Sequence, residues 1–201
     1  MPAVVLLTTA NKITIARILL VPLFVLSLIE YTASGRDVFR WLAVILFFVA
    51  AVGDGVDGWV ARRFNQRTEM GALLDPLADK LLLVLGLVVL SLDNGARLDR
   101  VPLWLTITVL ARDVMLLVLL VLVNYLVGKG TVRPHLIGKL ATVLQMTCVL
   151  WALLRLDAGA LFWWAAAATV CTAVSGLIYL GDGIAMLRQP KSKPSADQAA
   201  P

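Results

Sequence analysis

The sequence predicts an all-α integral membrane protein, and three observations support this prediction. The chain has 201 residues, of which 60% are hydrophobic and 15% are charged, and its mean hydropathy is +0.89. This composition is far more apolar than that of an ordinary soluble domain. About six stretches are long and apolar enough to cross a bilayer core of about 30 Å as helices. Lys and Arg gather at alternate ends of those stretches.

The six predicted spans follow one another with short connections. They occupy residues 13–29, 38–60, 70–92, 102–127, 135–154 and 161–187. Each provides close to the roughly 20 residues that one helical crossing needs. We expect a single transmembrane domain over residues 1–187, with residues 1–11 lying along the membrane surface. Residues 188–201 are polar and rich in proline, so we expect a disordered cytoplasmic tail there.

The basic residues predict the orientation of the spans, because Lys and Arg are enriched in cytoplasmic loops. With the N-terminus inside, twelve of the 18 Lys and Arg residues fall on the cytoplasmic side, five fall on the opposite side, and Arg112 lies within a span. We therefore predict a multi-pass protein of the cytoplasmic membrane with both termini in the cytoplasm. The same partition accounts for the net charge of +5, so the charge does not call for a nucleic-acid partner.

Four aspartates stand where the second and third spans meet the cytoplasmic face. Asp54 and Asp57 are spaced i, i+3 and Asp75 and Asp79 are spaced i, i+4, so each pair shares one side of its helix. Because these two helices run antiparallel, the four carboxylates can converge. Such a cluster in a low-dielectric site must be neutralised by protons or cations, and oxygen-only ligation favours a hard cation. The pattern predicts one or two Mg²⁺ or Mn²⁺ ions.

Small residues and an arginine accompany the aspartates. Gly58 and Gly71 are poor helix formers, and we interpret them as clearing room for a bulky polar ligand. Arg62, one turn beyond Gly58, suits a phosphate because its guanidinium can bind two oxygens. Cations beside a phosphate-binding arginine predict a diphosphate site, where metals stabilise a phosphoryl-type transfer. A carboxylate at the edge of the cluster can take the proton of an attacking hydroxyl.

The complete spacing is Asp54-x2-Asp57-Gly58-x2-Ala61-Arg62-x8-Gly71-x3-Asp75-x3-Asp79. It resembles the signature of the CDP-alcohol phosphatidyltransferase family at all eight fixed positions. The resemblance implies a fold of six transmembrane helices, a homodimer, and the replacement of CMP in a CDP-linked lipid by a second alcohol. It also implies that Asp54, Asp57 and Asp75 bind metal and that Asp79 is both a ligand and the general base. Gly58, Ala61, Arg62 and Gly71 match positions that line the CDP pocket.

The resemblance extends beyond this motif in two directions. Asn11, Thr14 and Arg17 look like the opening of the first helix in bacterial phosphatidylglycerophosphate synthases, and we include them among the candidates for binding the CDP lipid. Residues 111–116 and 132–139 also resemble the cardiolipin synthases of this family. The acceptor is therefore predicted to be glycerol 3-phosphate, with phosphatidylglycerol as the alternative.

Both acceptors carry a phosphate, which calls for cations near the metal site. Arg112 and Lys139 are candidates because charged residues inside spans are functional suspects, and Arg133 is a third. Alternative interpretations remain: Arg112 pairs only with Asp113 or a neighbouring helix, Lys139 only reaches the membrane surface, and Arg133 is a loop charge. His135 is interpreted as interfacial, and no partner can be named for Asp182.

Two other classes of membrane protein are considered. Intramembrane prenyltransferases also bind diphosphates through aspartates and magnesium, but they resemble this chain less because they have two distant Asp motifs and lack the Gly-x2-Ala-Arg element. A cation transporter could use an acidic cluster as its ion site. This chain has one such cluster, near one face, and no detectable internal repeat. The sequence therefore favours a phosphatidyltransferase that uses CDP-diacylglycerol.

Overall fold

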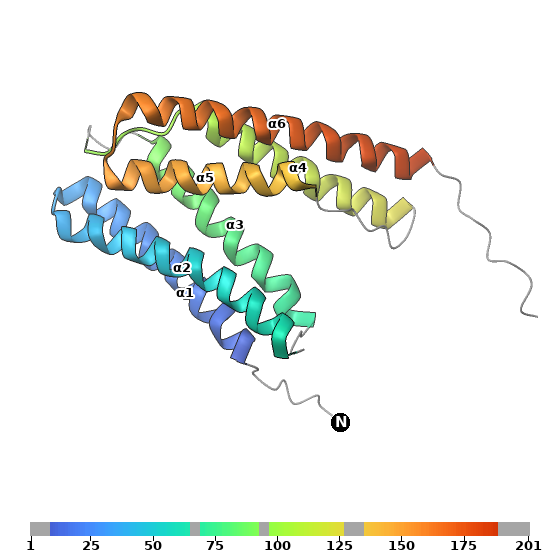
Figure 1. The fold of residues 1–201 in the computed structure, drawn as a ribbon, viewed down its shortest axis with the longest axis horizontal. Coiled ribbons are helices and arrows are strands. Elements are labelled where there is room, and N and C mark those ends of the chain that lie inside the picture. Colours follow the sequence, from blue (N-terminus) through green and yellow to red (C-terminus); the bar gives the residue numbers. More distant parts are fainter. Residues whose placement is uncertain (1–8, 65–68, 93–96, 127–134, 189–201) are drawn as a thin grey trace, which may run out of the picture.

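The structure is a computed structural model that describes residues 9–64, 69–92, 97–126 and 135–188, and these residues form six helices (Figure 1). Every predicted span coincides with one helix, so the helical prediction is confirmed. The helices are α1 (Thr9–Ser34), α2 (Asp37–Phe64), α3 (Glu69–Ser91), α4 (Leu103–Leu126), α5 (Leu136–Leu154) and α6 (Ala158–Arg188).

Helix α1 begins inside the segment that was expected to lie along the membrane surface. The helix includes residues 9–11 of that segment and runs on without a break past Pro22. Helix α6 ends at Arg188. Residues 1–8 and residues 189–201, which make up most of the predicted tail, lie outside the described part of the chain.

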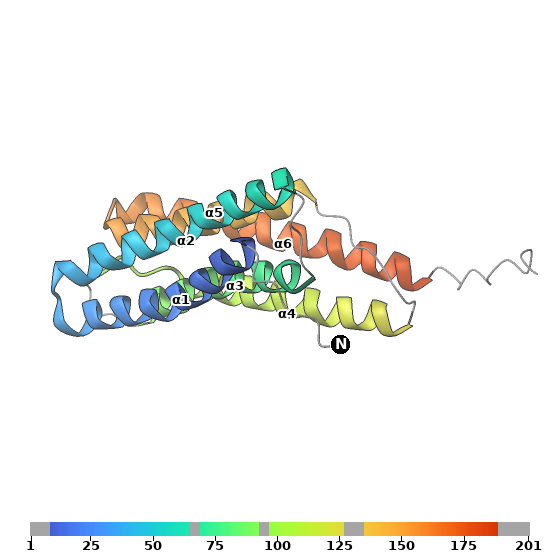
Figure 2. The same ribbon diagram turned by 90° about the horizontal axis from the view of Figure 1, so that it is seen from below.

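The helices form two groups with α3 between them. Helices α1 and α2 pack side by side in one group, and α6 packs on both α4 and α5 in the other. Helix α3 crosses from one group to the other and contacts α1, α2, α4 and α5 (Figures 1 and 2). The chain segment that carries half of the aspartate motif is therefore the central helix of the fold.

The core around α3 is tightly packed. Phe24 of α1 and Phe47 of α2 are both buried, and their ring centroids lie 5.7 Å apart. Gly86 of α3 faces this contact: a Cβ there would lie 3.3 Å from Phe24 and 3.4 Å from Val149 of α5. The absence of a side chain at Gly86 thus lets α1, α3 and α5 approach closely, as small residues do in membrane helix packing.

Polar contacts close the end of the bundle where α1 meets α2. Gly35 has a φ of +72°, a left-handed conformation that glycine adopts without strain. Arg97, in the segment before α4, donates from Nη1 to the Thr32 carbonyl at 2.5 Å. Tyr31 donates to the Arg97 carbonyl at 3.4 Å. The bond from Arg97 satisfies one of the last carbonyls of α1, which a helix cannot satisfy internally, and the bond from Tyr31 ties the segment before α4 to α1.

Tryptophans mark the same end of the bundle. Trp41 is near the start of α2, Trp104 near the start of α4, and Trp151 near the end of α5, while Trp163 and Trp164 are near the start of α6. Several contact one another or Phe162, including Trp104 with Phe162 at 6.1 Å and Trp151 with Trp164 at 6.0 Å. Amphipathic rings at one level are typical of a membrane interface, and here they come from four helices.

The outer surface of the helices is apolar. Leu117, Val121 and Leu177 are each more than 60% exposed, which is unfavourable in water but appropriate against lipid chains. Among the described residues, three helical segments are long and apolar enough to span a membrane: Leu103–Val123, Leu136–Leu154 and Ala158–Leu187. The chain is a multi-pass membrane protein.

The contact between Phe24 and Phe47 yields a stability prediction. Phe24→Ala removes a fully buried ring and should lower the free energy of unfolding by about 3 kcal/mol, the low end for such a cavity, because lipid solvates apolar groups in the unfolded state as well. Leu23→Ala, on the half-exposed side of the same helix, is the control and should cost well under about 1 kcal/mol. Thermal unfolding in detergent measures both, and equal losses would contradict this account of the core.

Candidate active site

The aspartate motif is divided between two consecutive helices. Helix α2 carries Asp54, Asp57, Gly58, Ala61 and Arg62 in its second half, and α3 carries Gly71, Asp75 and Asp79 in its first half. Helix α2 contacts α3, and only residues 65–68, outside the described part, join them. The predicted placement of the two halves on adjacent helices is therefore confirmed. Side chains of residues 54–79 lie outside the description, so the predicted ligand set stays a prediction.

The other donor-site candidates lie at the same end of the bundle. Asn11, Thr14 and Arg17 are in the first half of α1, and α1 starts at the end where α2 finishes (Figure 1). Helix α1 packs on both α2 and α3. The side chains of residues 9–17 are outside the description, and Arg133 lies outside the described residues altogether.

Arg112 of α4 is connected to the motif through a shared carboxylate. Its Nη1 lies 3.0 Å from Oδ1 of Asp113, and the same oxygen lies 2.8 Å from Nζ of Lys80 on α3. Lys80 directly follows Asp79 in the chain. The Arg112 side chain is 11% exposed and that of Asp113 is 17% exposed, whereas that of Lys80 is 48% exposed. The pair of Arg112 and Asp113 is therefore largely buried, and Lys80 approaches it from the surface. The pairing considered for Arg112 from the sequence does occur, but it also ties α4 to the motif.

The pairing with Asp113 leaves part of the Arg112 guanidinium unused. Its Nε is buried and has no hydrogen-bond partner in the described structure. An arginine carries five N–H donors and accepts nothing, and a buried donor without a partner is rare and costly. An anion that accepts from this group would remove that cost, which fits the prediction that Arg112 receives a phosphate.

Two glycines enclose the Arg112 side chain. A Cβ on Gly176 of α6 would lie 3.3 Å from Cγ of Arg112 and 3.4 Å from Met115. A Cβ on Gly138 of α5 would lie 3.4 Å from Nη2 of Arg112. The side chain therefore crosses α6 at Gly176 and reaches α5 at Gly138. Lys139, the other acceptor candidate described here, is exposed and follows Gly138 directly, so the structure brings this part of α5 to Arg112.

His135 and Asp182 are partners. His135 Nε2 lies 2.7 Å from Oδ2 of Asp182, and the His135 backbone N–H donates to Tyr179 Oη at 3.0 Å. Sequence reasoning gave Asp182 no partner and did not single out Tyr179, Gly138 or Gly176. The available signal was the i, i+3 spacing of Gly176, Tyr179 and Asp182, which places them on one side of α6.

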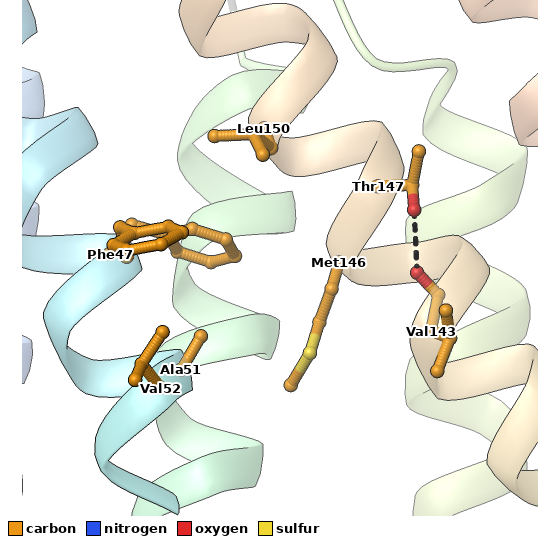
Figure 3. A pocket seen from close by; sticks show the side chains of 8 residues that line it. Phe47, Ala51, Val52, Val143, Met146, Thr147 and Leu150 are labelled. Atoms are coloured by element: carbon orange, nitrogen blue, oxygen red, sulfur yellow. Dashed lines mark hydrogen bonds between the residues drawn. The ribbon is translucent and has the colours of Figure 1, made fainter. Parts of the chain in front are cut away.

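An apolar groove lies between α2 and α5 (Figure 3). Its cavity volume is about 270 Å³, and it is lined by Phe47, Phe48, Ala51, Val52, Val143, Met146, Thr147 and Leu150. The one hydroxyl, of Thr147, donates to the Val143 carbonyl at 2.9 Å and is thus already satisfied. Asp54 is three residues beyond Ala51, or about 4.5 Å along α2. The groove therefore leads to the level of the aspartates.

Comparison with known protein families identifies the family of this chain. A model of the family described as CDP-alcohol phosphatidyltransferase matches residues 7–174. The chain belongs to this family. It is a transferase of phospholipid biosynthesis, and the resemblance recognised in the motif is confirmed. CDP-alcohol phosphatidyltransferases use divalent metal ions.

Two curated relatives share the greater part of the chain. A CDP-diacylglycerol–glycerol-3-phosphate 3-phosphatidyltransferase of Bacillus subtilis is 35% identical over 148 residues, which cover 69% of this chain and 72% of the relative. The protein of the same name from Escherichia coli K12 is 35% identical over 143 residues, covering 71% of this chain and 75% of the relative. The chain is thus similar to two transferases named for the same acceptor.

The close contact between Gly176 and Arg112 can be tested with a matched pair of variants. Gly176→Ala should push Arg112 by a few tenths of an ångström and lower phosphatidyltransferase activity roughly 3- to 10-fold, less than the loss for a 1 Å misplacement. Gly181→Ala, in the same helix, meets nothing within 4 Å and should leave activity unchanged. The rates of the two purified variants are compared with wild type. Equal rates for both variants would show that the space at Gly176 does not position Arg112.

Proposed function

We propose that this phosphatidyltransferase is a phosphatidylglycerophosphate synthase: it transfers a phosphatidyl group from CDP-diacylglycerol to the hydroxyl of glycerol 3-phosphate and releases CMP. The observation that carries this proposal is the complete aspartate motif on α2 and α3, in a chain 35% identical to enzymes named for this acceptor. Phosphatidylglycerol, the alternative acceptor, would make the enzyme a cardiolipin synthase. The names of the relatives favour glycerol 3-phosphate.

The carboxylates of the motif suit a divalent cation. Asp54, Asp57, Asp75 and Asp79 offer oxygen ligands only, which is the donor set that Mg²⁺ and Mn²⁺ prefer. Among the described side chains, no group of three or more His, Cys, Asp or Glu residues could hold a metal, so the motif is the candidate site. When bound, one or two such ions would neutralise the diphosphate of the donor and stabilise its leaving group.

The roles proposed for the donor-side residues are those that the family resemblance implies. Asp79 takes the proton of the acceptor hydroxyl as the hydroxyl attacks the phosphorus that carries the diacylglycerol. The bond from that phosphorus to CMP breaks, and CMP leaves with its phosphate. Gly58, Ala61, Arg62 and Gly71 line the CDP pocket, and Asn11, Thr14 and Arg17 border it from α1. The groove between α2 and α5 holds an acyl chain of the donor, because the groove is apolar and ends at the level of Asp54.

The acceptor lies on the opposite side of the motif. Arg112 offers a buried Nε without a hydrogen-bond partner. Its ion-pair partner Asp113 also pairs with Lys80, the residue that follows Asp79. A phosphate bound by Arg112, with Lys139 and Arg133 adding charge, would therefore hold the acceptor hydroxyl near the general base. A guanidinium is suited to this task because it can bind two phosphate oxygens at once.

The placement in the membrane follows from the charges. All six helices cross the inner membrane, both termini are cytoplasmic, and the active site faces the cytoplasm, where the water-soluble acceptor is available. The aromatic rings at the other end of the helices support the crossing itself, because such rings gather at a membrane interface. The resemblance to the family supports a homodimer as part of this proposal.

The proposed function is tested with purified protein in detergent, CDP-diacylglycerol and Mg²⁺ or Mn²⁺. Glycerol 3-phosphate and phosphatidylglycerol are offered in parallel, and the release of CMP is followed together with lipid chromatography. Product from glycerol 3-phosphate alone supports the proposal. Product from phosphatidylglycerol alone identifies a cardiolipin synthase. Turnover that needs neither CDP-diacylglycerol nor metal would exclude the phosphatidyltransferase reaction in favour of another class.

The general base is tested by Asp79→Asn. This variant should lose at least about 10²-fold in turnover, the usual contribution of a general base, with less damage to binding of the CDP lipid. Asp54→Asn and Asp75→Asn are the comparison variants and should weaken metal and nucleotide binding as well. Steady-state rates and equilibrium binding of CDP-diacylglycerol separate the two groups. Near-normal turnover of Asp79→Asn would show that another group is the base.

The groove is tested by filling it. Ala51→Phe places a ring between α2 and α5 and should raise the KM for CDP-diacylglycerol about tenfold, as expected when an apolar contact worth about 1.4 kcal/mol is lost. The KM for glycerol 3-phosphate should stay the same. Val49→Phe adds the same ring on an exposed part of α2 that does not line the groove, and it should change neither constant. Equal effects of the two variants would mean that the acyl chain lies elsewhere.

A further inference from the structure

Helix α5 begins in an unusual way. Its N-cap residue, His135, has the extended backbone typical of a cap (φ −89°, ψ 145°), but its side chain makes no capping hydrogen bond to α5. Capping side chains normally satisfy the first free N–H groups of a helix. The imidazole is instead engaged with α6, so the start of α5 is held by tertiary contacts rather than by its own cap.

Three contacts join His135 to Tyr179 and Asp182, and we call these three residues the clasp. The imidazole Nε2–H donates to Asp182 Oδ2 at 2.7 Å, because a carboxylate can only accept. The His135 backbone N–H donates to Tyr179 Oη at 3.0 Å. The two rings also meet edge to face, with centroids 5.2 Å apart. Tyr179 and Asp182 are one turn apart on α6, so one rigid face holds both ends of the contact.

The clasp is next to Arg112. A Cβ on Gly138 would lie 3.0 Å from Tyr179 Oη and 3.4 Å from Arg112 Nη2, so both side chains end over the same glycine. Arg112 also crosses α6 at Gly176, one turn before Tyr179. The clasp fixes α5 against α6, and these are the two helices between which Arg112 is enclosed. A shift of α5 would therefore change where the buried Nε of Arg112 lies.

We propose that His135, Tyr179 and Asp182 are positioning residues for the phosphate of the acceptor. They hold the start of α5 on α6, and thereby fix the Arg112 guanidinium and the neighbouring Lys139 in the arrangement that receives a phosphate. They do not touch the reacting atoms. This inference rests on the proposed function, in which Arg112 binds the phosphate of glycerol 3-phosphate.

Variants of the full-length enzyme remove one contact at a time. Tyr179→Phe keeps the ring and loses the hydroxyl that accepts from His135, and Asp182→Leu removes the carboxylate at similar volume. Asp182→Asn is the conservative variant, since its amide oxygen can still accept from the imidazole. Asp37→Leu is the control: it removes a carboxylate that pairs with Arg40 at the start of α2, at the other end of the bundle.

The first readout is hydrogen exchange of the peptide that contains the His135 amide, followed by mass spectrometry. Tyr179→Phe and Asp182→Leu should make this peptide exchange about fivefold faster or more, as expected when a hydrogen bond is lost, while a peptide within residues 146–153 does not change. Asp182→Asn should stay near wild type, as should Asp37→Leu. Unchanged exchange in both clasp variants would show that the clasp does not hold α5, and would overturn the proposal.

The second readout separates positioning from catalysis. In Tyr179→Phe and Asp182→Leu the KM for glycerol 3-phosphate should rise about fivefold or more, with kcat and the KM for CDP-diacylglycerol within about twofold of wild type. A fall in kcat at constant acceptor KM would overturn the positioning role. The two variants combined should raise the acceptor KM by less than the product of their single effects, because they loosen the same contact.

Failure of the proposed function is distinguishable from failure of the clasp. A wild-type enzyme that makes no product from glycerol 3-phosphate refutes the proposed acceptor. The hydrogen-exchange rates of the clasp variants still decide whether the clasp holds α5. Inorganic phosphate then replaces the acceptor as the probe. It should slow exchange around His135 in wild type and in Asp37→Leu, but not in Tyr179→Phe. Phosphate protection that is equal in all variants would refute the link between the clasp and phosphate.

Discussion

The arrangement of the site depends on one constraint: charge inside a membrane protein must be paired. Asp113 meets this constraint for two cations at once, because a single carboxylate oxygen lies 2.8 Å from Lys80 Nζ and 3.0 Å from Arg112 Nη1. Removing Asp113 would leave both cations without their shared counter-charge next to a largely buried part of the bundle. The pairing therefore joins α3, just after Asp79, to α4. Through Arg112 it also fixes the relation of α4 to the glycines of α5 and α6.

The residues that shape the site differ in kind on its two sides. The proposed donor side is a contiguous motif on two helices joined by residues 65–68, so its residues are close in sequence. The proposed acceptor side is assembled from α4, α5 and α6, and its parts are small residues and long-range polar contacts such as that between His135 and Asp182, 47 positions apart. A family that keeps its donor and varies its acceptor alcohol would be expected to place the variable half on separately adjustable helices.

The fold was largely predictable from sequence because each helix contains a long apolar stretch bounded by polar residues, and the motif has a fixed spacing that identifies its family. Arg112 could be singled out from sequence because a charge within a span is costly and needs a reason, and its pairing with Asp113 was one of the interpretations considered. The partners of Asp182 and the role of Tyr179 were not predictable. A lone aspartate in a span shows that a partner must exist, but helical periodicity does not tell which helix lies opposite. The contacts of Gly138 and Gly176 could not be predicted either, because the sequence does not show which side chain packs against a glycine.

The groove between α2 and α5 has a consequence for how the enzyme meets its substrates. Three of its lining residues, Phe48, Val52 and Val143, are about half exposed, so the groove is open to the bilayer along its length. A lipid can enter it sideways without leaving the leaflet, whereas a polar acceptor arrives from water. The two substrates thus reach one centre by diffusion in two and in three dimensions. Occupancy of the groove would therefore depend on the mole fraction of the donor lipid in the membrane. It would not depend on the volume of water around the membrane.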